Sequence, residues 1–205
     1  MMSKKYYIVG AGDNSGTNFS KKENEYVIAA DGGLKVLQQL GIKADWIVGD
    51  FDSLGYIPEG SHVIKHPTQK DETDMMLAVS KAIELGADTI EIFGGTGGRI
   101  DHTFANFQTM LYASGEGVEI CMTDDENTYF VITNQNIRLS AKQKGTFSVF
   151  AIGGTARRVN IEGGKYLLKD YDLEETNPIG ISNEYIGKEV NISVGEGSLL
   201  IISVN

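Results

Sequence analysis

The amino-acid sequence predicts two domains: an α/β domain over residues 1–124, with a mainly parallel, Rossmann-like sheet, and an all-β sandwich domain over residues 125–205. Two observations support this division. In the first part, short β-rich runs alternate with segments of helical spacing, which is typical of βαβ units. In the second part, helical periodicity disappears and short β-rich runs recur between turns, as in antiparallel sandwiches and barrels.

The elements of the first domain follow from hydrophobic spacing and from the glycines that end them. Apolar runs rich in β-branched and aromatic residues predict the strands. Met76, Val79 and Ile83 have helical spacing, and Gly86 is a suitable helix stop. The predicted strands cover residues 6–9, 26–30, 46–48, 63–64, 90–93 and 118–122, and the predicted helices cover residues 34–40, 73–85 and 102–114.

The second domain is predicted from strand signals alone. Its β-rich runs are short and are separated by glycines, so neighbouring strands are expected to pair antiparallel. The predicted strands cover residues 129–133, 137–139, 146–152, 158–161, 190–194 and 199–204.

The composition excludes several classes of function. The net charge of −10 and the pI near 4.8 argue against nucleic-acid binding, which requires a basic face. No apolar run approaches the ~20 residues that span a bilayer, and no signal peptide is recognisable. The single cysteine, Cys121, cannot form an internal disulfide and is expected to be an inert core residue. We therefore expect a cytoplasmic protein with neither a membrane nor a nucleic-acid partner.

Three acidic segments are the most informative feature of the chain. Each stands where an apolar run ends and a loop or helix begins, which is where α/β sheets collect functional residues. The carboxylates would repel one another without a bound cation, so Mg²⁺ with a nucleotide polyphosphate fits them. The segments are residues 49–53, with Asp50 and Asp52; residues 70–74, with Lys70, Asp71 and Asp74; and residues 97–102, with Arg99, Asp101 and His102.

Asp50 and Asp52 flank Phe51 directly after a predicted strand. Strand alternation would place both carboxylates on one side and Phe51 on the other, as a divalent-metal site requires. The alternative is an ordinary aspartate-rich turn.

Asp71 and Asp74 are three residues apart at a predicted helix start and would share one face. The alternative is a capping box, with Asp71 as N-cap and Asp74 at the third helical position. Both interpretations can hold, because a helix N-terminus also attracts phosphate.

A glycine-rich segment, residues 94–98, leads from a predicted strand to Arg99. Glycines allow backbone N–H groups to approach phosphates, and Arg99 offers a bidentate fork; the alternative is merely a tight connection. Asp101 is also a candidate helix cap, and His102 a candidate phosphate or nucleotide contact. Asp31, after the second strand, adds a carboxylate at the same sheet edge.

These motifs, in this order, resemble the bacterial type of thiamine pyrophosphokinase. The resemblance implies a homodimer with an α/β catalytic domain that binds ATP and Mg²⁺ and a β-sandwich domain. Thiamine would bind in a cleft between subunits and receive pyrophosphate from ATP, giving AMP and thiamine diphosphate. The matching residues are Ala30-Asp31-Gly32-Gly33, Gly41, residues 49–53, 70–74 and 97–102, Asn106, Lys165-Tyr166 and Gly180-Ile181-Ser182-Asn183-Glu184.

The resemblance also implies roles for individual residues. Asp50, Asp52 and Asp74 would hold Mg²⁺. Lys70 and Arg99 would contact phosphate oxygens, with Asp31, Asp101 and His102 on the ATP side, and Asp71 is a candidate to orient or deprotonate the hydroxyl. Ser182 and Asn183 would hydrogen-bond the pyrimidine of thiamine. Tyr185 would either stack on the cationic thiazolium or be an ordinary strand aromatic.

Two other functions compete with this one. The first is a pyrophosphokinase for another alcohol, such as a hydroxymethylpterin, which the Ser182-Asn183 pair disfavours. The second is a non-catalytic sensor of nucleotide or thiamine. The complete set of acidic motifs disfavours a sensor, because a pure binder does not need so costly a carboxylate cluster.

Overall fold

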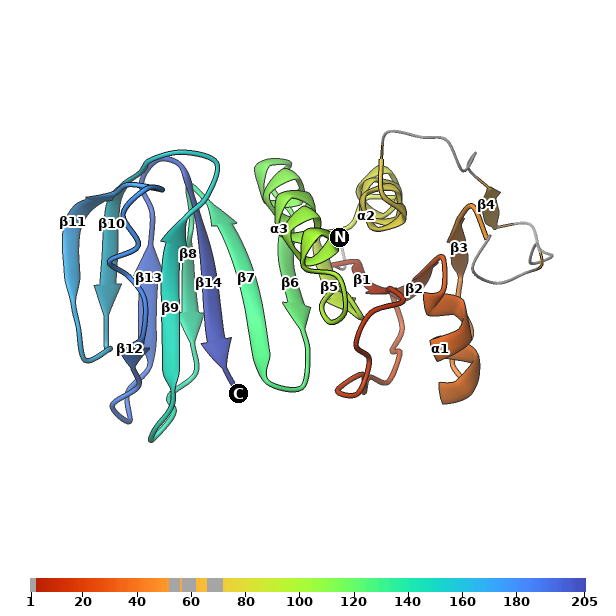
Figure 1. Ribbon diagram of the computed structural model, residues 1–205, viewed down its shortest axis with the longest axis horizontal. Helices are drawn as coiled ribbons and strands as arrows, with labels where there is room; N and C mark the ends of the chain where they lie inside the picture. The colour runs from red at the N-terminus through yellow and green to blue at the C-terminus, as the bar shows by residue number, and fades with distance from the viewer. Residues whose placement is uncertain (1–2, 52–55, 57–61, 66–71) are drawn as a thin grey trace. The chain divides into compact units, whose positions relative to one another are not determined.

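The computed structural model describes residues 3–51, 56, 62–65 and 72–205 (Figure 1). The chain forms two compact units, an N-terminal unit, Met1–Asp125, and a C-terminal unit, Glu126–Asn205. Among the described residues, no helix is both long and apolar enough to cross a membrane.

A parallel sheet with helices on both faces forms the N-terminal unit. Its strands lie in the order β6-β5-β1-β2-β3-β4, and each pairs in parallel with its neighbour. The strands are β1 (Lys5–Val9), β2 (Glu25–Ala30), β3 (Trp46–Gly49), β4 (Val63–Lys65), β5 (Thr89–Phe93) and β6 (Glu119–Thr123). The helices are α1 (Gly33–Leu40), α2 (Asp74–Glu84) and α3 (Ile100–Gly115).

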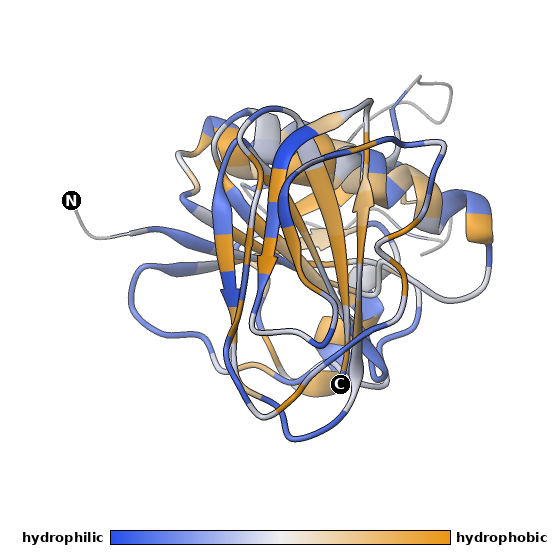
Figure 2. Ribbon diagram, turned by 90° about the vertical axis from the view of Figure 1, so that its left-hand side faces the viewer, coloured by the Kyte–Doolittle hydropathy of each residue, from blue (hydrophilic) through white to orange (hydrophobic). Residues whose placement is uncertain are grey.

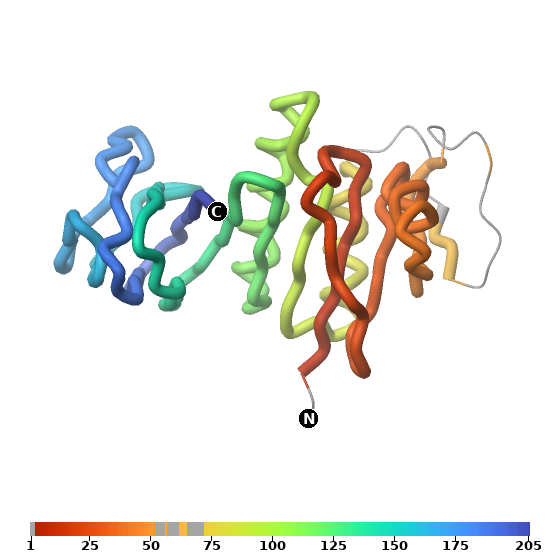
Figure 3. Tube along the Cα trace, turned by 90° about the horizontal axis from the view of Figure 1, so that it is seen from below, coloured from red at the N-terminus to blue at the C-terminus, as the bar shows by residue number. Residues whose placement is uncertain are grey.

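The two faces of this sheet are covered by different helices (Figures 1 and 3). Helix α1 buries Leu34 and Leu37 against alternate residues of β1 and β2, including Val9 and Val27. Helices α2 and α3 pack against each other on the opposite face. Because both faces are covered, β1 and β2 are apolar after their first residue, as is typical of buried parallel strands.

The α/β character of this unit agrees with the prediction, but a Rossmann-like arrangement is not confirmed. The connection from β1 to β2, residues 10–24, is fully described and contains no helix. In a Rossmann unit this crossover is helical, and the helix N-terminus fixes the turn that follows the first strand.

Two antiparallel sheets face each other in the C-terminal unit. One has the order β12-β9-β14-β7 and the other β11-β10-β13-β8. The strands are β7 (Asn127–Thr133), β8 (Asn136–Leu139), β9 (Thr146–Ala151), β10 (Ala156–Glu162), β11 (Leu168–Leu173), β12 (Asn183–Glu184), β13 (Val190–Ser193) and β14 (Ser198–Val204). The predicted all-β region is therefore antiparallel.

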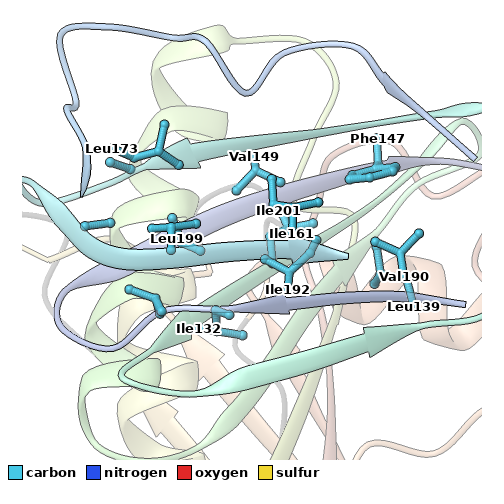
Figure 4. Close-up of a cluster of buried hydrophobic side chains, with 14 of the residues drawn as sticks. Ile132, Leu139, Phe147, Val149, Ile161, Leu173, Val190, Ile192, Leu199 and Ile201 are labelled. Atoms are coloured by element: carbon cyan, nitrogen blue, oxygen red, sulfur yellow. The ribbon is translucent and has the colours of Figure 1, made fainter. Parts of the chain in front are cut away.

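Strand alternation builds the core of the C-terminal unit. In β13, Val190 and Ile192 are fully buried while Asn191 between them is exposed. Hydrophobic and hydrophilic residues alternate in the same way along several strands in Figure 2. Side chains from both sheets, including Phe147, Ile192 and Leu199, meet in one cluster (Figure 4). This cluster holds the two sheets together.

Two strands of this unit escaped sequence analysis. In β11 the residues between Leu168 and Leu173 are all exposed, so the strand has no apolar alternation to detect. Strand β12 consists of only two residues and depends on its pairing with β9.

Replacing Ile192 by alanine is expected to destabilise the protein by about 2–5 kcal/mol, because the fully buried side chain would leave a cavity between the sheets. Denaturant unfolding of parent and variant would measure the change. Asn191→Ala, one residue away on the exposed face, is the matched control and should change stability by less than about 0.5 kcal/mol. Equal effects of the two substitutions would contradict the assignment of the core.

Candidate active site

A pocket of about 460 Å³ opens at the carboxyl ends of β1, β2 and β5. The chain leaves β1 toward β2 and leaves β5 in the opposite direction, toward β6. This reversal is the switch point at which open α/β sheets bind ligands. The pocket is lined by Gly10, Ala11 and Gly12 after β1, by Ala30 and Asp31, by residues 72–75 at the start of α2, by residues 94–97 and Arg99 after β5, and by His102 and Asn106 of α3.

Asp31 brings the ends of β2 and β3 together. Its backbone N–H donates to the Val48 carbonyl at 2.8 Å. A Cβ atom added at Gly49 would lie 3.0 Å from the Asp31 Cα, so glycine allows the two backbones to approach closely here. Asp50 follows directly after Gly49. The structure therefore places the backbone that carries Asp50 beside a pocket-lining carboxylate, although Asp50 itself is not among the lining residues.

The local geometry around Phe51 differs from the prediction. Strand β3 ends at Gly49, and Phe51 has a left-handed backbone with φ of 64°. Its ring is only 3% exposed and packs with Val9 and Leu37 in the core beneath α1. The strand alternation used to pair Asp50 with Asp52 therefore does not extend across these residues. Asp52 lies outside the described residues.

Helix α2 begins differently from the predicted capping box. Thr73 is the N-cap, and its hydroxyl accepts a hydrogen bond from the Met76 N–H at 3.1 Å. Asp74 is the first residue of the helix and lines the pocket. A carboxylate there faces the positive end of the helix dipole. The capping prediction was wrong for Asp74 because the threonine before it already supplies the cap; Asp71 and Lys70 lie outside the described residues.

The glycine-rich loop after β5 is held in place by three neighbouring elements. The buried Asn106 of α3 donates from Nδ2 to the Gly95 carbonyl at 2.6 Å. The Thr96 hydroxyl donates to the Asp124 carboxylate at 2.9 Å. The Gly94 carbonyl accepts from the Gly12 N–H at 2.9 Å. The loop thus presents a defined backbone to the pocket.

Arg99 stands at the pocket edge with its guanidinium already held. Its Nε donates to Asp101 Oδ1 at 3.1 Å and its Nη2 donates to Oδ2. This contact with Arg99 holds the pKa of the Asp101 carboxyl below its ordinary value. The helix cap is Arg99, whereas Asp101 is the second residue of α3, so the prediction of Asp101 as a cap was wrong. The next residue, His102, lines the pocket.

The acidic residues that the structure describes do not form a ready-made metal cluster. Within these residues, no group of three or more histidine, cysteine or acidic side chains could hold a metal ion. The pocket nevertheless contains the carboxylates of Asp31, Glu72 and Asp74. Mg²⁺ in nucleotide sites uses one or two carboxylates together with phosphate oxygens and water. The donors present are thus of the right chemical type for a nucleotide-bound Mg²⁺.

The predicted thiamine-side residues lie near the end of the C-terminal unit's β9–β12 edge. Ser182 is exposed and has a left-handed backbone, with φ of 57°. Asn183 is 4% exposed; its Nδ2 donates to the Tyr166 carbonyl at 2.6 Å, and its Oδ1 accepts from the Tyr166 N–H at 3.0 Å. The Asn183 side-chain amide thus makes the same pair of hydrogen bonds with the Tyr166 backbone that a neighbouring strand would make. Tyr166 itself is exposed.

Tyr185 belongs to the core within the C-terminal unit. Its ring is 4% exposed, packs at 5.0 Å from the Phe147 ring, and its hydroxyl is 2.8 Å from Ser203 Oγ. Burial raises the pKa of this phenol. Of the two sequence interpretations, these contacts match an ordinary strand aromatic.

Other residues were not singled out from the sequence. Thr73 and Glu72 line the pocket without having been assigned a role, and Asn14 contacts the loops around it. Thr73 had a detectable signal, since threonine before an acidic residue is a common helix start. Asn14 had none: its carbonyl partners, Gly10 and Gly12, are near in the sequence, but the hydrogen bonds to them depend on the conformation of the loop.

The single thiol is unsuited to catalysis. Burial raises the pKa of Cys121 to about 12, so the reactive thiolate is absent near neutral pH. This agrees with its predicted role as an inert residue in a strand.

The fold and the pocket define a protein of the α/β ligand-binding class that carries a second, antiparallel β unit. A family model described as thiamin pyrophosphokinase, catalytic domain, matches residues 19–122. A second, described as thiamin pyrophosphokinase, vitamin B1 binding domain, matches residues 134–199. The chain belongs to the thiamin pyrophosphokinase family, which confirms the resemblance seen in the sequence.

Relatives and solved structures agree with this family. The thiamine pyrophosphokinase of Bacillus subtilis (strain 168) is 28% identical over 187 residues, which cover 88% of this chain and 87% of the relative. A crystal structure of thiamine pyrophosphokinase from Bacillus subtilis superposes with a TM-score of 0.85 at 27% identity, covering 98% of this chain and 99% of the other. A thiamin pyrophosphokinase structure from Geobacillus thermodenitrificans gives a TM-score of 0.83 at 27% identity, with 98% and 97% covered.

Proposed function

We propose that this protein transfers pyrophosphate from ATP to the hydroxyl of thiamine, giving AMP and thiamine diphosphate. One observation carries the proposal: the catalytic and vitamin B1 binding family models match this chain in succession, one in each compact unit. The pocket supports it, because three charged residues, Asp31, Asp74 and Arg99, line one cavity at the switch point.

In the proposed reaction the thiamine hydroxyl oxygen attacks the β-phosphorus of ATP in line. A bond forms from this oxygen to the β-phosphorus, and the bond from the β-phosphorus to the α,β-bridging oxygen breaks, so that AMP leaves. The hydroxyl proton passes to a carboxylate, for which Asp71 is our candidate. Catalysis of this kind depends mainly on positioning and charge neutralisation.

Arg99 and Lys70 are proposed to contact phosphate oxygens, with Asp31, Asp101 and His102 on the ATP side. The guanidinium fork of Arg99 matches phosphate as well as carboxylate geometry. Asp101 bonds to Nε and Nη2, on one edge of the guanidinium, and so orients the group beside the pocket. Incoming phosphate would meet the other edge, formed by Nη1 and the second N–H of Nη2.

Asp50, Asp52 and Asp74 are proposed to hold Mg²⁺, which would neutralise charge on the phosphates of bound ATP. The support is the chemistry of the donors, all hard carboxylate oxygens, and the position of Asp74 at the pocket.

On the thiamine side, Ser182, Asn183 and Tyr185 are proposed to form the binding edge. Ser182 is exposed and available for a direct contact. The buried Asn183 and Tyr185 would shape the edge from beneath, since their polar atoms bond to Tyr166 and Ser203.

The experiment that tests this function is incubation of the protein with ATP, Mg²⁺ and thiamine, followed by separation of the products. We expect AMP and thiamine diphosphate in equal amounts and neither product without thiamine. Formation of ADP would indicate single-phosphoryl transfer. Turnover of a hydroxymethylpterin but not of thiamine would identify the other alcohol, and binding without turnover would identify a sensor.

We further propose a cytoplasmic homodimer in which each thiamine site combines residues from both subunits. The support is the resemblance to the family, in which the carboxylates and the thiamine motif come from different domains. Subunit complementation tests this arrangement without assuming a particular dimer geometry.

A mixture of Asp74→Asn and Asn183→Ala proteins, each with little activity alone, is expected to regain up to roughly a quarter of the parent activity. Random pairing makes half of all dimers mixed, with one subunit of each variant. Each mixed dimer has one intact site of its two, so about a quarter of all sites are intact. Activity should be measured after subunit exchange has been verified by mass spectrometry. Absence of recovery would show that each chain builds its own site.

A further inference from the structure

The turn after β1 lines the pocket, and no helix follows it to stabilise it. Residues 10–24 lead from β1 to β2 as a fully described, non-helical loop. Gly10, Ala11 and Gly12 of this loop line the pocket. The catalytic family model begins only at residue 19, so this turn lies outside the match. Some other group must fix its backbone.

The side chain of Asn14 provides that restraint. Its Nδ2 donates to the Gly10 carbonyl at 3.0 Å and to the Gly12 carbonyl at 2.9 Å. Its Oδ1 accepts a hydrogen bond from the buried Thr17 hydroxyl at 2.9 Å. One half-buried amide thus joins both ends of the turn to the chain beyond it.

The same turn interlocks with the glycine-rich loop across the switch point. The Gly12 N–H donates to the Gly94 carbonyl at 2.9 Å, and the Asp13 N–H donates to the Thr96 carbonyl at 2.7 Å. A Cβ atom added at Gly94 would lie 2.5 Å from Asn14 Nδ2, so the asparagine is packed directly against that loop. The two loops form adjoining walls of the pocket, and the second leads to Arg99.

We infer that Asn14 is a positioning residue for nucleotide binding, holding the β1 turn and the Gly94–Gly97 loop in the arrangement that receives ATP. The inference rests on the proposed function for the identity of the nucleotide. Asn14 acts through the backbone of the turn and is not a catalytic residue. Its effect should therefore appear in the affinity for ATP, and neither in the affinity for thiamine nor in the chemical step.

The test is Asn14→Ala, with the Kd of a non-hydrolysable ATP analogue measured by calorimetry in the presence of Mg²⁺. We expect the Kd, and the KM for ATP, to rise about tenfold, because two hydrogen bonds that preorganise the turn are lost. The kcat and the KM for thiamine should stay within about twofold of the parent. A parent-like Kd for the analogue would overturn the inference, as would a loss confined to kcat.

Asn14→Asp separates hydrogen bonding from side-chain volume. The aspartate has the same shape and keeps an acceptor for Thr17, but an oxygen replaces Nδ2 and faces the two glycine carbonyls. We expect at least as large a rise in Kd as with alanine. Parent-like binding by Asn14→Asp would show that volume alone matters, and would overturn the inference.

Asn160→Ala is the matched control in the C-terminal unit. The Asn160 amide is also half-buried, donates to the Arg158 carbonyl at 3.1 Å and to Ser193 Oγ at 3.3 Å, and accepts from the Asp170 N–H. Its loss should leave the Kd for the ATP analogue unchanged. A rise equal to that of Asn14→Ala would mean that any such amide affects binding through general stability.

Thr17→Val keeps the test decisive if the Asn14 variants do not fold. It removes only the hydroxyl that orients the Asn14 amide, and should raise the Kd two- to threefold. An unchanged Kd in Thr17→Val would then overturn the inference. The binding measurement also separates the two proposals. If the parent protein binds the ATP analogue but makes no AMP, the proposed function is refuted. The role of Asn14 is still tested in that case, because the Kd of the variants can be compared with that of the parent protein.

Discussion

Replacing Asp74 by asparagine is expected to lower kcat/KM by about 10²–10³-fold while the protein remains folded. Asp74 is the first residue of α2 and lines the pocket, so the substitution removes a negative charge where Mg²⁺–ATP is proposed to bind. The amide has the same shape but is a much weaker ligand for a hard cation. Initial rates measured over a range of Mg²⁺ concentrations should show weakened dependence on the metal.

Glu84→Gln is the matched control for Asp74→Asn. Glu84 ends the same helix, is exposed, and pairs with Lys81 at 2.8 Å. Removing its charge should change activity by less than about twofold, because exposed pairs contribute little. Near-normal turnover of Asp74→Asn at limiting Mg²⁺ would refute the metal assignment.

Replacing Arg99 by alanine is expected to lower kcat by about 10²–10³-fold, because the guanidinium proposed to contact the transferring phosphates would be lost. Arg99→Lys keeps the charge but cannot make the bidentate contact, so an intermediate loss of about tenfold is expected. Steady-state kinetics with ATP and thiamine varied in turn would show the effect on kcat.

The matched control for Arg99 is Arg138→Ala in the C-terminal unit. The two arginines are similarly exposed, with 73% and 68% of their side-chain surface accessible, and each pairs with one carboxylate. Loss of Arg138 should leave turnover unchanged. If both Arg99 variants behave like the parent, the Arg99–Asp101 pair merely stabilises the start of α3.

Much of the site could be predicted because its signals are local. Strands that end in Asp31-Gly32-Gly33, in Asp50 or in a glycine-rich loop with Arg99 are visible in the sequence. Parallel sheets collect such strand ends along one edge, so a shared site followed from strand type alone. The structure places Asp31, Asp74, Arg99 and His102 around one pocket. The switch from α/β to antiparallel β was equally visible in the change of hydrophobic period.

Predictions that depended on the conformation of a single turn were less successful. Phe51 adopts a left-handed backbone because its ring is drawn into the core beneath α1, and strand alternation does not extend across it. Thr73 caps α2, so Asp74 has no capping role to fill. In both cases one side-chain contact selects the local conformation: the packing of the Phe51 ring in the core, and the hydrogen bond to the Thr73 hydroxyl. The residue pattern alone does not distinguish these conformations from the predicted ones.

Hydrophobic period and short motifs are local properties of the residue order, so they indicated the division into an α/β and a β unit, and the family, without a structure. Which polar side chains line the pocket, and which instead bond to the backbone, depends on the three-dimensional arrangement of the chain. Nothing in the residue type distinguishes Asn14 and Asn183 from an asparagine exposed on the surface. The Asn14 amide nevertheless donates to the Gly10 carbonyl within its own loop, and the Asn183 amide donates to the Tyr166 carbonyl of a segment far away in the sequence. Such roles depend on which backbone groups the fold brings within about 3 Å, and no local pattern encodes that distance.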